Sequence, residues 1–528
     1  MRRTWRIGLI AVLLAAVATT AGFAGGGGEK PKDDVTLSVL LFDRATAGFI
    51  PEGGIQAKYI QENVKKKLGY NVKFVIMPRF PDVDRVNVLM ASGMAPDVSF
   101  LYSDAAVGNY VKSGGLTELA GLLDKYAPNL KKLIGDDCLS YGRWSGVQYA
   151  VPAKRTLLAK SGTFIRKDWL DKLGLGLPKT RDEWYADLQA FKNKDPGNLG
   201  GKVLPFEVGR ILVADPDWNF LPLLNSFLPK MSAEDAAVFS YSTVSKWAGP
   251  GYKEGMRFLN KMYSEGLINT EFPLDKDGTL YNRDITQGLT GSTMNNWDYM
   301  YMTAPGLQSE MAKVVPGSLL VPIDPFVNSE GKTTKPLYNP NGLFLFVPKF
   351  SKNAVAAVQY LEWMADPDVR FFLQSGVKGI HYTDEVNGIP VNYVDQAKLP
   401  DAQKTHWLDF CPILNGKEFG SDAKNAEAAA LGSSYSPGTQ EQVKQSYIYG
   451  MKDGYFPFHF DKVIDSDAKY NGALNQKSSE MVVKLITATK PAEFDATYDS
   501  LVKEWLSMGG QAVIDERRAA YKAQTAGK

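Results

Sequence analysis

The side chains that most often carry out chemistry in proteins are sparse in this sequence and do not gather in a catalytic spacing. The three histidines, His381, His406 and His459, lie far apart and match neither HExxH nor a Cys-His zinc pattern. The stretch "GSSYSPG" lacks the GxSxG order of a nucleophile elbow, and "GGGGEK" lacks the spacing and flanks of a phosphate-binding loop. The sequence therefore predicts no zinc, serine-nucleophile or nucleotide chemistry, and no cofactor.

Two classes of site remain open. A secreted glycan-cleaving enzyme needs only two carboxylates that face each other across a cleft, and a sequence does not fix their separation. A binding site without chemistry needs aromatic faces and planar polar groups, and the chain has 10 Trp, 25 Tyr and 26 Phe to supply them. A cell-surface adhesin is a more distant alternative.

The first residues have the order of a secretory signal peptide, with arginines, the apolar run "IGLIAVLLAAVA" and small residues. We expect a signal peptide over 1–24 and a flexible linker over 25–34. The apolar run is too short to span a bilayer, and the rest of the chain has no second candidate. Phe23 stands where the lipid-attachment box of bacterial lipoproteins needs cysteine, so we expect a free exported protein, periplasmic or extracellular. The alternative is an uncleaved anchor.

Net charge, cysteine content and chain length narrow the class of protein further. Without the three signal arginines the 60 Lys plus Arg become 57, against 58 Asp plus Glu, so no basic field favours nucleic acid. The two cysteines, Cys138 and Cys411, exclude a disulfide framework and are either buried thiols or one bridge. A chain of 528 residues exceeds one ordinary core, which predicts two or more lobes.

The elements that would position a site begin with an alternation of strands and amphipathic helices. They are strands 35–42, 71–77 and 97–102 and helices 54–69 and 83–93. Such an order predicts an open parallel sheet, which binds ligands beyond the carboxyl ends of its strands. Asp43 and Arg44 follow the first strand, and Tyr102 and Asp104 follow the third. They are candidate ligand contacts; ordinary solvated loop residues are the alternative.

Helices dominate the later sequence. They are predicted at 180–192, 252–266, 353–367 and 493–510. The first opens with the capping box formed by Thr180 and Glu183. The last places Trp505 on one face with Phe494 and Tyr498, a stripe typical of a core. No internal repeat of fixed period is present.

Seven stretches, in one order along nearly the whole mature chain, resemble the extracellular solute-binding proteins of bacterial carbohydrate ABC importers. The similarity is greatest to the oligosaccharide-receptor branch, which includes alginate-oligosaccharide-binding proteins. The stretches are "GMAPDVSFLY", "GGLTELAGLLDKYAPNL", "GVQYAVP", "FIRKDWLDKLGLGLPKTRDEWYADLQAFKNKDP", "GYKEGMRFLNKMYSEGLINTEF", "GVKGIHY" and "SLVKEWLSMGGQAVIDERRAAY".

The resemblance implies an α/β periplasmic-binding-protein fold of two lobes, each an open sheet flanked by helices, with a ligand cleft at the hinge. The chain would cross near "YAVPAKR", "VVPGSLLVP" and "GVKGIHY", which puts 35–153 and 315–375 in lobe 1 and 154–314 and 376–528 in lobe 2. It further implies a receptor, not an enzyme, that hands a saccharide to membrane permease subunits. A receptor that closes and docks as one unit, without a heptad run, is expected to be a monomer.

Aromatic residues with polar neighbours outside helical stripes are the further candidates for ligand contact. In "MNNWDYMY", Trp297 lies beside Asn296 and Asp298, where the family's second lobe commonly presents a tryptophan to the sugar. Trp218 lies in the loop "ADPDWNF".

Two charged or titratable residues at the crossings complete the set. Arg155 could hold a hydroxyl or a uronate carboxylate bidentately; a surface or interlobe ion pair is the alternative. His381 lies at a crossing, where a hinge histidine bonded to backbone is the alternative.

Many relatives carry a calcium loop of alternating Asp and Asn after the helix at 180–192. Here Asp195 and Asn198 remain, but the closing acidic pair is absent from "NKDPGNLGGKVLPF". Too few oxygen ligands are left, so we expect no bound calcium.

Overall fold

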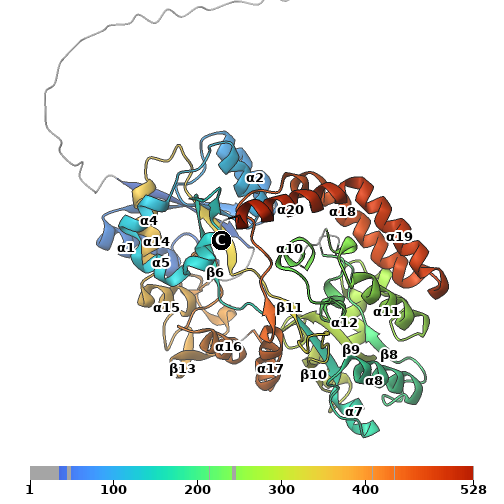
Figure 1. Cartoon of the computed structure of the whole chain (residues 1–528). Coiled ribbons are helices and arrows are strands. Elements are labelled where there is room, and N and C mark those ends of the chain that lie inside the picture. The colour runs from blue at the N-terminus through green and yellow to red at the C-terminus, as the bar shows by residue number, and fades with distance from the viewer. Residues whose placement is uncertain are drawn as a thin grey trace, which may run out of the picture.

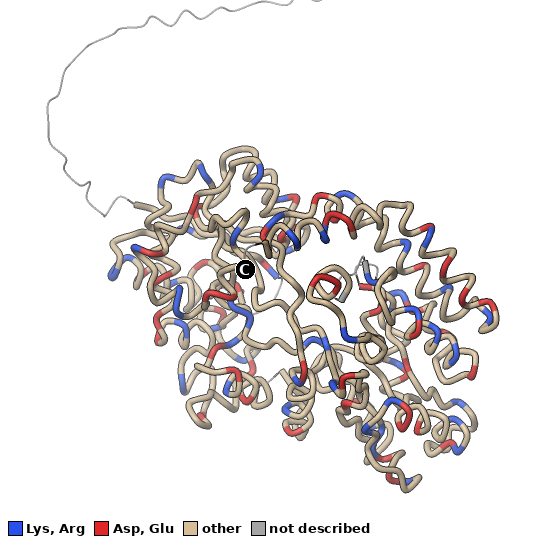
Figure 2. The backbone as a smooth tube through the Cα atoms, in the orientation of Figure 1, with Lys and Arg blue, Asp and Glu red and all other residues tan. Residues whose placement is uncertain are grey.

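Two lobes, each a sheet flanked by helices, make up the computed structural model, which describes residues 35–44, 49–212, 215–240, 245–406, 408–432 and 434–526 (Figure 1). The predicted signal peptide and linker, 1–34, lie outside the described residues. Basic and acidic residues are interspersed over both lobes, as Figure 2 shows, without a region of one sign. None of the described helices is long and apolar enough to cross a membrane.

Lobe 1 begins with the predicted alternation. β1 and β2 pair in parallel, in register from Thr36 opposite Asn71 to Asp43 opposite Pro78. A parallel bridge between Val39 and Val98 joins β1 to the segment that leads into β3. β3 then edges a four-stranded sheet of order β15-β6-β12-β3. The strands are β1 (Thr36–Asp43), β2 (Asn71–Pro78), β3 (Ser99–Leu101), β6 (Ala150–Arg155), β12 (Asn341–Phe346) and β15 (Leu414–Asn415), with the hairpins β4 (Arg143–Trp144) and β5 (Val147–Gln148), and β13 (Tyr382–Val386) and β14 (Ile389–Tyr393).

Helices cover this sheet and bury its apolar side chains in one continuous core. α1 ends as predicted at Gly69, whose φ of 79° is a left-handed conformation that glycine adopts without a side-chain clash. The helices are α1 (Ile55–Leu68), α2 (Asp82–Ala91), α3 (Asp104–Lys112), α4 (Ala120–Tyr126), α5 (Pro128–Ile134), α6 (Asp136–Ser140), α14 (Ala354–Met364) and α15 (Pro367–Ser375). The predicted order strand, helix, strand, helix, strand is therefore confirmed.

Lobe 2 is built on a mixed sheet of order β10-β7-β9-β8, in which only β8 and β9 are parallel. The strands are β7 (Ser161–Arg166), β8 (Leu204–Glu207), β9 (Thr290–Asn296) and β10 (Leu320–Ile323). The helices before β10 are α7 (Lys167–Leu173), α8 (Arg181–Lys194), α9 (Leu221–Asn225), α10 (Ala233–Asp235), α11 (Tyr252–Ser264), α12 (Thr279–Thr286) and α13 (Leu307–Val314). The capping box of Thr180 and Glu183 forms at the start of α8 as predicted.

The C-terminal third adds helices to lobe 2. They are α16 (Asp422–Leu431), α17 (Gln440–Met451), α18 (Asp465–Val483), α19 (Phe494–Trp505) and α20 (Gln511–Thr525). α18 to α20, red in Figure 1, run along the upper side of lobe 2. Trp505 is fully buried with Phe494 and Tyr498, so the predicted core stripe is confirmed.

Core membership places the lobe boundaries differently from the sequence at two points. β10 pairs with β7, so residues 320–323 belong to lobe 2, whereas the sequence put 315–375 in lobe 1. Residues 410–414 pack in the lobe 1 core, and β15 pairs with β6, whereas the sequence put 376–528 in lobe 2. In both cases the chain stays hydrogen-bonded to the sheet of the lobe it comes from, beyond the point where the sequence placed the boundary.

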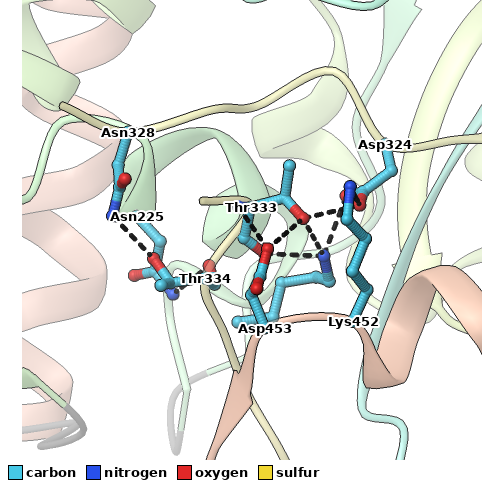
Figure 3. A network of polar contacts seen from close by, with 8 residues as sticks. Asn225, Asp324, Asn328, Thr333, Thr334, Lys452 and Asp453 are labelled. Carbon is cyan, nitrogen blue, oxygen red and sulfur yellow. Dashed lines mark hydrogen bonds and ion pairs between the residues drawn. The ribbon is translucent and has the colours of Figure 1, made fainter. Parts of the chain in front are cut away.

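A buried polar network pins two of the connecting segments together (Figure 3). Lys335 donates to Asp324 at 2.8 Å, and both side chains are less than a tenth exposed. The Thr333 hydroxyl donates to Asp324 at 2.6 Å, and the Thr333 amide donates to Asp453 at 3.0 Å. Beside them β11 (Lys335–Pro336) pairs in parallel with β16 (Gly454–Tyr455). The chain leaving lobe 2 is thus fastened to the segment that follows α17.

Candidate functional site

The carboxyl ends of the parallel strands in lobe 1 carry a polar group, as the sequence predicts. Arg44 follows β1, and its guanidinium donates to the Tyr102 hydroxyl at 2.9 Å and to Asp409 at 2.6 Å. Burial alone would lower the pKa of Arg44, but the hydrogen bond and charge of Asp409 outweigh it and raise that pKa. Asp43 ends β1 and is exposed, and its carbonyl accepts from the Arg79 amide at 2.9 Å. The structure therefore brings together three of the four strand-end candidates, which are Asp43, Arg44 and Tyr102.

Three residues of this group could not be named from the sequence. Asp409 is 365 positions from Arg44 and meets it only through the fold. Arg79 and Phe80 follow β2, and the Arg79 guanidinium lies 4.3 Å from the centre of the Tyr102 ring. One signal could have indicated Arg79 and Phe80. Because β2 runs parallel to β1, it must end at the same edge of the sheet, so the loop after β2 lies with the loops that follow β1 and β3.

A second group lies where the chain passes from lobe 1 to lobe 2. The Arg155 guanidinium lies 4.8 Å from the centre of the Tyr338 ring and donates to the Asn339 carbonyl at 3.1 Å. The Tyr338 hydroxyl donates in turn to Asn296 at 3.3 Å. Tyr338 was missed because it lies in a connecting segment without a strand or helix pattern.

Asn296 continues this group into lobe 2. Its amide donates to Asp298 at 2.6 Å, and the Tyr435 hydroxyl donates to the same carboxylate at 2.8 Å. Burial raises the pKa of Asp298. Arg155, Asn296 and Asp298 are thus connected through Tyr338, as planar polar groups beside aromatic rings.

Trp218 is half-buried beneath a cation. The Lys160 ammonium lies 4.9 Å from the centre of the Trp218 ring and 3.1 Å from Asp215. Because Ser161 pairs with Asn296 across β7 and β9, Lys160 lies next to the chain of polar groups just described. Burial would raise the pKa of Asp215, but the charges of Lys160 and Lys246 outweigh it and lower that pKa.

A cavity of about 340 Å³ lies between lobe 1 and the C-terminal helices. Asp104 lines this cavity, and desolvation raises its pKa to about 6. The cavity also reaches Asn339, the partner of Arg155. Its other lining residues are Ala105, Tyr141, Trp144, Pro457, Phe458, His459, Phe460, Lys462, Val463, Ile464, Asp467, Ala468, Asn471 and Arg517. Aromatic faces and planar polar groups are both present, which suits a ligand with apolar C–H faces and many hydroxyls.

Two predicted contacts are buried in this conformation. Trp297 is 3% exposed and packs edge-on against Tyr447, with ring centres 5.1 Å apart. His381 is fully buried; its Nδ1 accepts from the Val377 amide and its Nε2 bonds to the Gln403 carbonyl. The alternative for His381, a histidine bonded to backbone, describes what is seen. A ligand role for Trp297 stays a prediction that this conformation does not support.

A larger cavity, of about 840 Å³, lies mainly on lobe 1. Its walls come mainly from α1, α5, α14 and α15, and Lys154, Glu418 and Gly420 complete them.

Metal ligands do not gather in the residues that the structure describes: no group of three His, Cys, Asp or Glu could hold an ion there. The Asp195 carboxylate accepts from the amides of Leu199, Gly200 and Gly201, and these bonds lower its pKa. Its oxygens are thus turned toward backbone donors. Cys138 and Cys411 are separate buried thiols, which settles the choice left open by the sequence.

Residues 53–370 match the family model described as bacterial extracellular solute-binding protein. The chain belongs to this family. Along nearly its whole length it is also similar to the polygalacturonan/rhamnogalacturonan-binding protein YtcQ of Bacillus subtilis, with 24% identity over 551 residues and 99% of each chain covered. Lipoprotein LipO of the same species is 26% identical over 396 residues, which cover 72% of this chain and 74% of LipO.

The solute-binding fold is also that of solved structures. FusA of S. pneumoniae, an ABC-transporter substrate-binding protein determined in complex with kestose, superposes with a TM-score of 0.60 at 18% identity. The alignment covers 93% of this chain and 100% of FusA. At this identity the likeness concerns the fold, and it confirms the predicted two-lobed architecture.

Proposed function

We propose that this solute-binding protein captures an oligosaccharide between its lobes and delivers it to the permease subunits of an ABC importer. The observation that carries the proposal is the pairing of aromatic rings with planar polar groups on both lobes. Arg44 and Tyr102 lie on lobe 1, and Trp218 and Asn296 lie on lobe 2. The saccharide ligands named for YtcQ and FusA support the same class.

A thermal-shift screen tests the proposal directly. At about 100 times its dissociation constant, a ligand that binds only the folded state stabilises it by roughly 2.7 kcal/mol. We expect at least one oligosaccharide of a broad library, including kestose and oligogalacturonides, to raise the melting temperature. A library without any such member would contradict the proposal.

We further propose that the captured saccharide leaves chemically unchanged. The relatives YtcQ and FusA are both named binding proteins, which supports this proposal. Incubating the protein with its ligand and assaying reducing ends over hours tests this. Products that disappear when one carboxylate is substituted would instead establish a glycan-cleaving enzyme.

The proposed location is outside the cytoplasm, without a lipid anchor, because Phe23 replaces the cysteine that would be acylated. The relative LipO is named a lipoprotein, so Phe23 in place of cysteine would distinguish this chain, as a free protein, from a lipid-anchored relative. Palmitate labelling in a bacterial host should leave the wild-type chain unlabelled and label Phe23→Cys. Labelling of the wild-type chain would contradict the absence of an anchor.

The protein is proposed to act as a monomer that binds no nucleic acid. The interspersed charges of Figure 2 offer no field for a polyanion. Light scattering at micromolar concentration should return the mass of one chain. A mass twice as large would contradict the proposal.

A further inference from the structure

Phe80 is the most exposed large apolar side chain in the part of the chain that the structure describes, with 74% of its surface open to solvent. It lies between the end of β2 at Pro78 and the start of α2 at Asp82. This is the carboxyl edge of the parallel strands, where Arg44 and Tyr102 also lie. The ring is left open at the edge where an open sheet of parallel strands binds its ligands, which makes Phe80 a candidate ligand contact.

Arg79 holds this ring in a fixed orientation. The Arg79 guanidinium carbon lies 4.4 Å from the centre of the Phe80 ring and 4.3 Å from the centre of the Tyr102 ring. Asp82 pairs with Arg79 at 2.6 Å, and both of these side chains are only 14% exposed. The cation thus covers one face of Phe80 and leaves the other face open.

The Arg79 backbone also holds this loop in place. Its amide donates to the Asp43 carbonyl at the end of β1, at 2.9 Å. A ring held by its neighbours before the ligand arrives loses little side-chain entropy on binding, and this lowers the free-energy cost of association.

Further polar groups are joined to Phe80 through Arg79, which contacts both the Phe80 and the Tyr102 rings. The Tyr102 ring that Arg79 contacts carries a hydroxyl, which Arg44 reaches at 2.9 Å, and Arg44 is itself held by Asp409. A flat apolar face beside hydroxyl, guanidinium and carboxylate groups fits a pyranose or furanose ring, whose C–H face is apolar and whose rim carries hydroxyls.

We propose that Phe80 is the lobe 1 platform on which a sugar ring of the ligand stacks, and that Arg79 is the residue that positions it. This inference rests on the proposed function and deepens it by naming a contact surface on lobe 1. The Arg79 contact that orients the ring lies wholly within lobe 1.

The test measures affinity and melting temperature together, with the library member that most stabilises the wild-type protein as the probe. Phe80→Ala should weaken binding about tenfold or more and leave the melting temperature unchanged, because the ring is already exposed. Phe80→Tyr should keep the affinity within a few fold. The matched controls are Val88→Ala and Met94→Ala, each 66% exposed on or just after α2, and both should bind normally.

Arg79 is tested through its dependence on Phe80. Arg79→Gln should weaken binding on its own but add little in the Phe80→Ala background, since a residue that acts through another is not additive with it. A purely structural role would instead lower the melting temperature equally in both backgrounds.

The outcomes separate this inference from the proposed function. If no saccharide stabilises the wild-type protein, the proposed function fails and the platform fails with it. If the wild-type protein binds and Phe80→Ala binds within twofold, or if the two controls lose as much as Phe80→Ala, only the platform is overturned.

Discussion

The ammonium of Lys160 lies 4.9 Å from the centre of the Trp218 ring and is tied to Asp215 at 3.1 Å. The residue just before β7 is thus a cation that contacts a half-buried indole about 58 positions further along the chain. The arrangement resembles that of Arg79 and Phe80 on the other lobe. In both, a positive charge lies over an aromatic ring.

Trp218→Ala is expected to weaken saccharide binding about tenfold, because it removes an aromatic contact from lobe 2. Isothermal titration with the ligand found by the screen measures the loss. Trp247→Phe is the matched control: Trp247 is 1% exposed, so its substitution should lower the melting temperature and leave affinity unchanged. Unaltered binding by Trp218→Ala would remove this residue from the site.

Trp505→Ala is expected to destabilise the protein by about 3 to 5 kcal/mol, since it opens a cavity among fully packed side chains. The same substitution at Trp297, also buried, should act in the same way. Differential scanning calorimetry and ligand titration on both variants check this. A Trp297→Ala protein that melts normally but binds poorly would restore Trp297 as a ligand contact.

Asp324→Ala is expected to lower stability by about 3 to 5 kcal/mol, because it leaves the buried Lys335 ammonium without its carboxylate. Lys452 reaches the same carboxylate at 3.9 Å but is 55% exposed, so Lys452→Met should change stability by less than about 1 kcal/mol. Denaturant unfolding of both variants makes the comparison. Equal effects would show that burial of the pair is not the cause.

Glu207→Gln should change how stability depends on pH. Burial is the main reason that the pKa of Glu207 rises to about 8, from 4.5 in an unfolded chain. Between these two values the folded state binds more protons than the unfolded state, so stability falls as the pH rises.

The glutamine variant does not lose this stability as the pH rises, because glutamine does not titrate. It should match the wild-type protein near pH 5 and exceed it by on the order of 1 to 3 kcal/mol near pH 9. Melting curves at both pH values decide the matter; a constant difference between the two proteins would contradict the assignment.

Local signals carried the fold prediction far because each one depends on neighbours in sequence. The capping box at Thr180, the stop at Gly69 and the stripe that ends in Trp505 are all settled within a few turns of helix. The lobe boundaries were less accurate, since the pairing of β10 with β7 joins residues about 155 positions apart and leaves no local trace.

The candidate site also divides into residues that local patterns indicate and residues that only the tertiary fold brings in. Arg44 and Tyr102 were found because a parallel sheet places strand ends at one edge. Asp409 and Tyr338 were missed, since each meets the site only through the tertiary fold. Trp297 was favoured for its polar neighbours, but periodicity does not show on which side of the β9 end an indole packs.

Both native thiols are sealed inside lobe 1, and burial raises the pKa of each to about 12, so neither presents a thiolate to a reagent at neutral pH. Cysteines introduced on the surface would therefore be the only sites that take up a maleimide dye. Lys66 on lobe 1 and Asn193 on lobe 2 are both exposed, so Lys66→Cys and Asn193→Cys would provide one labelling site on each lobe. Donor and acceptor fluorophores placed there would report the opening and closing of the lobes in single molecules, with the wild-type cysteines left in place.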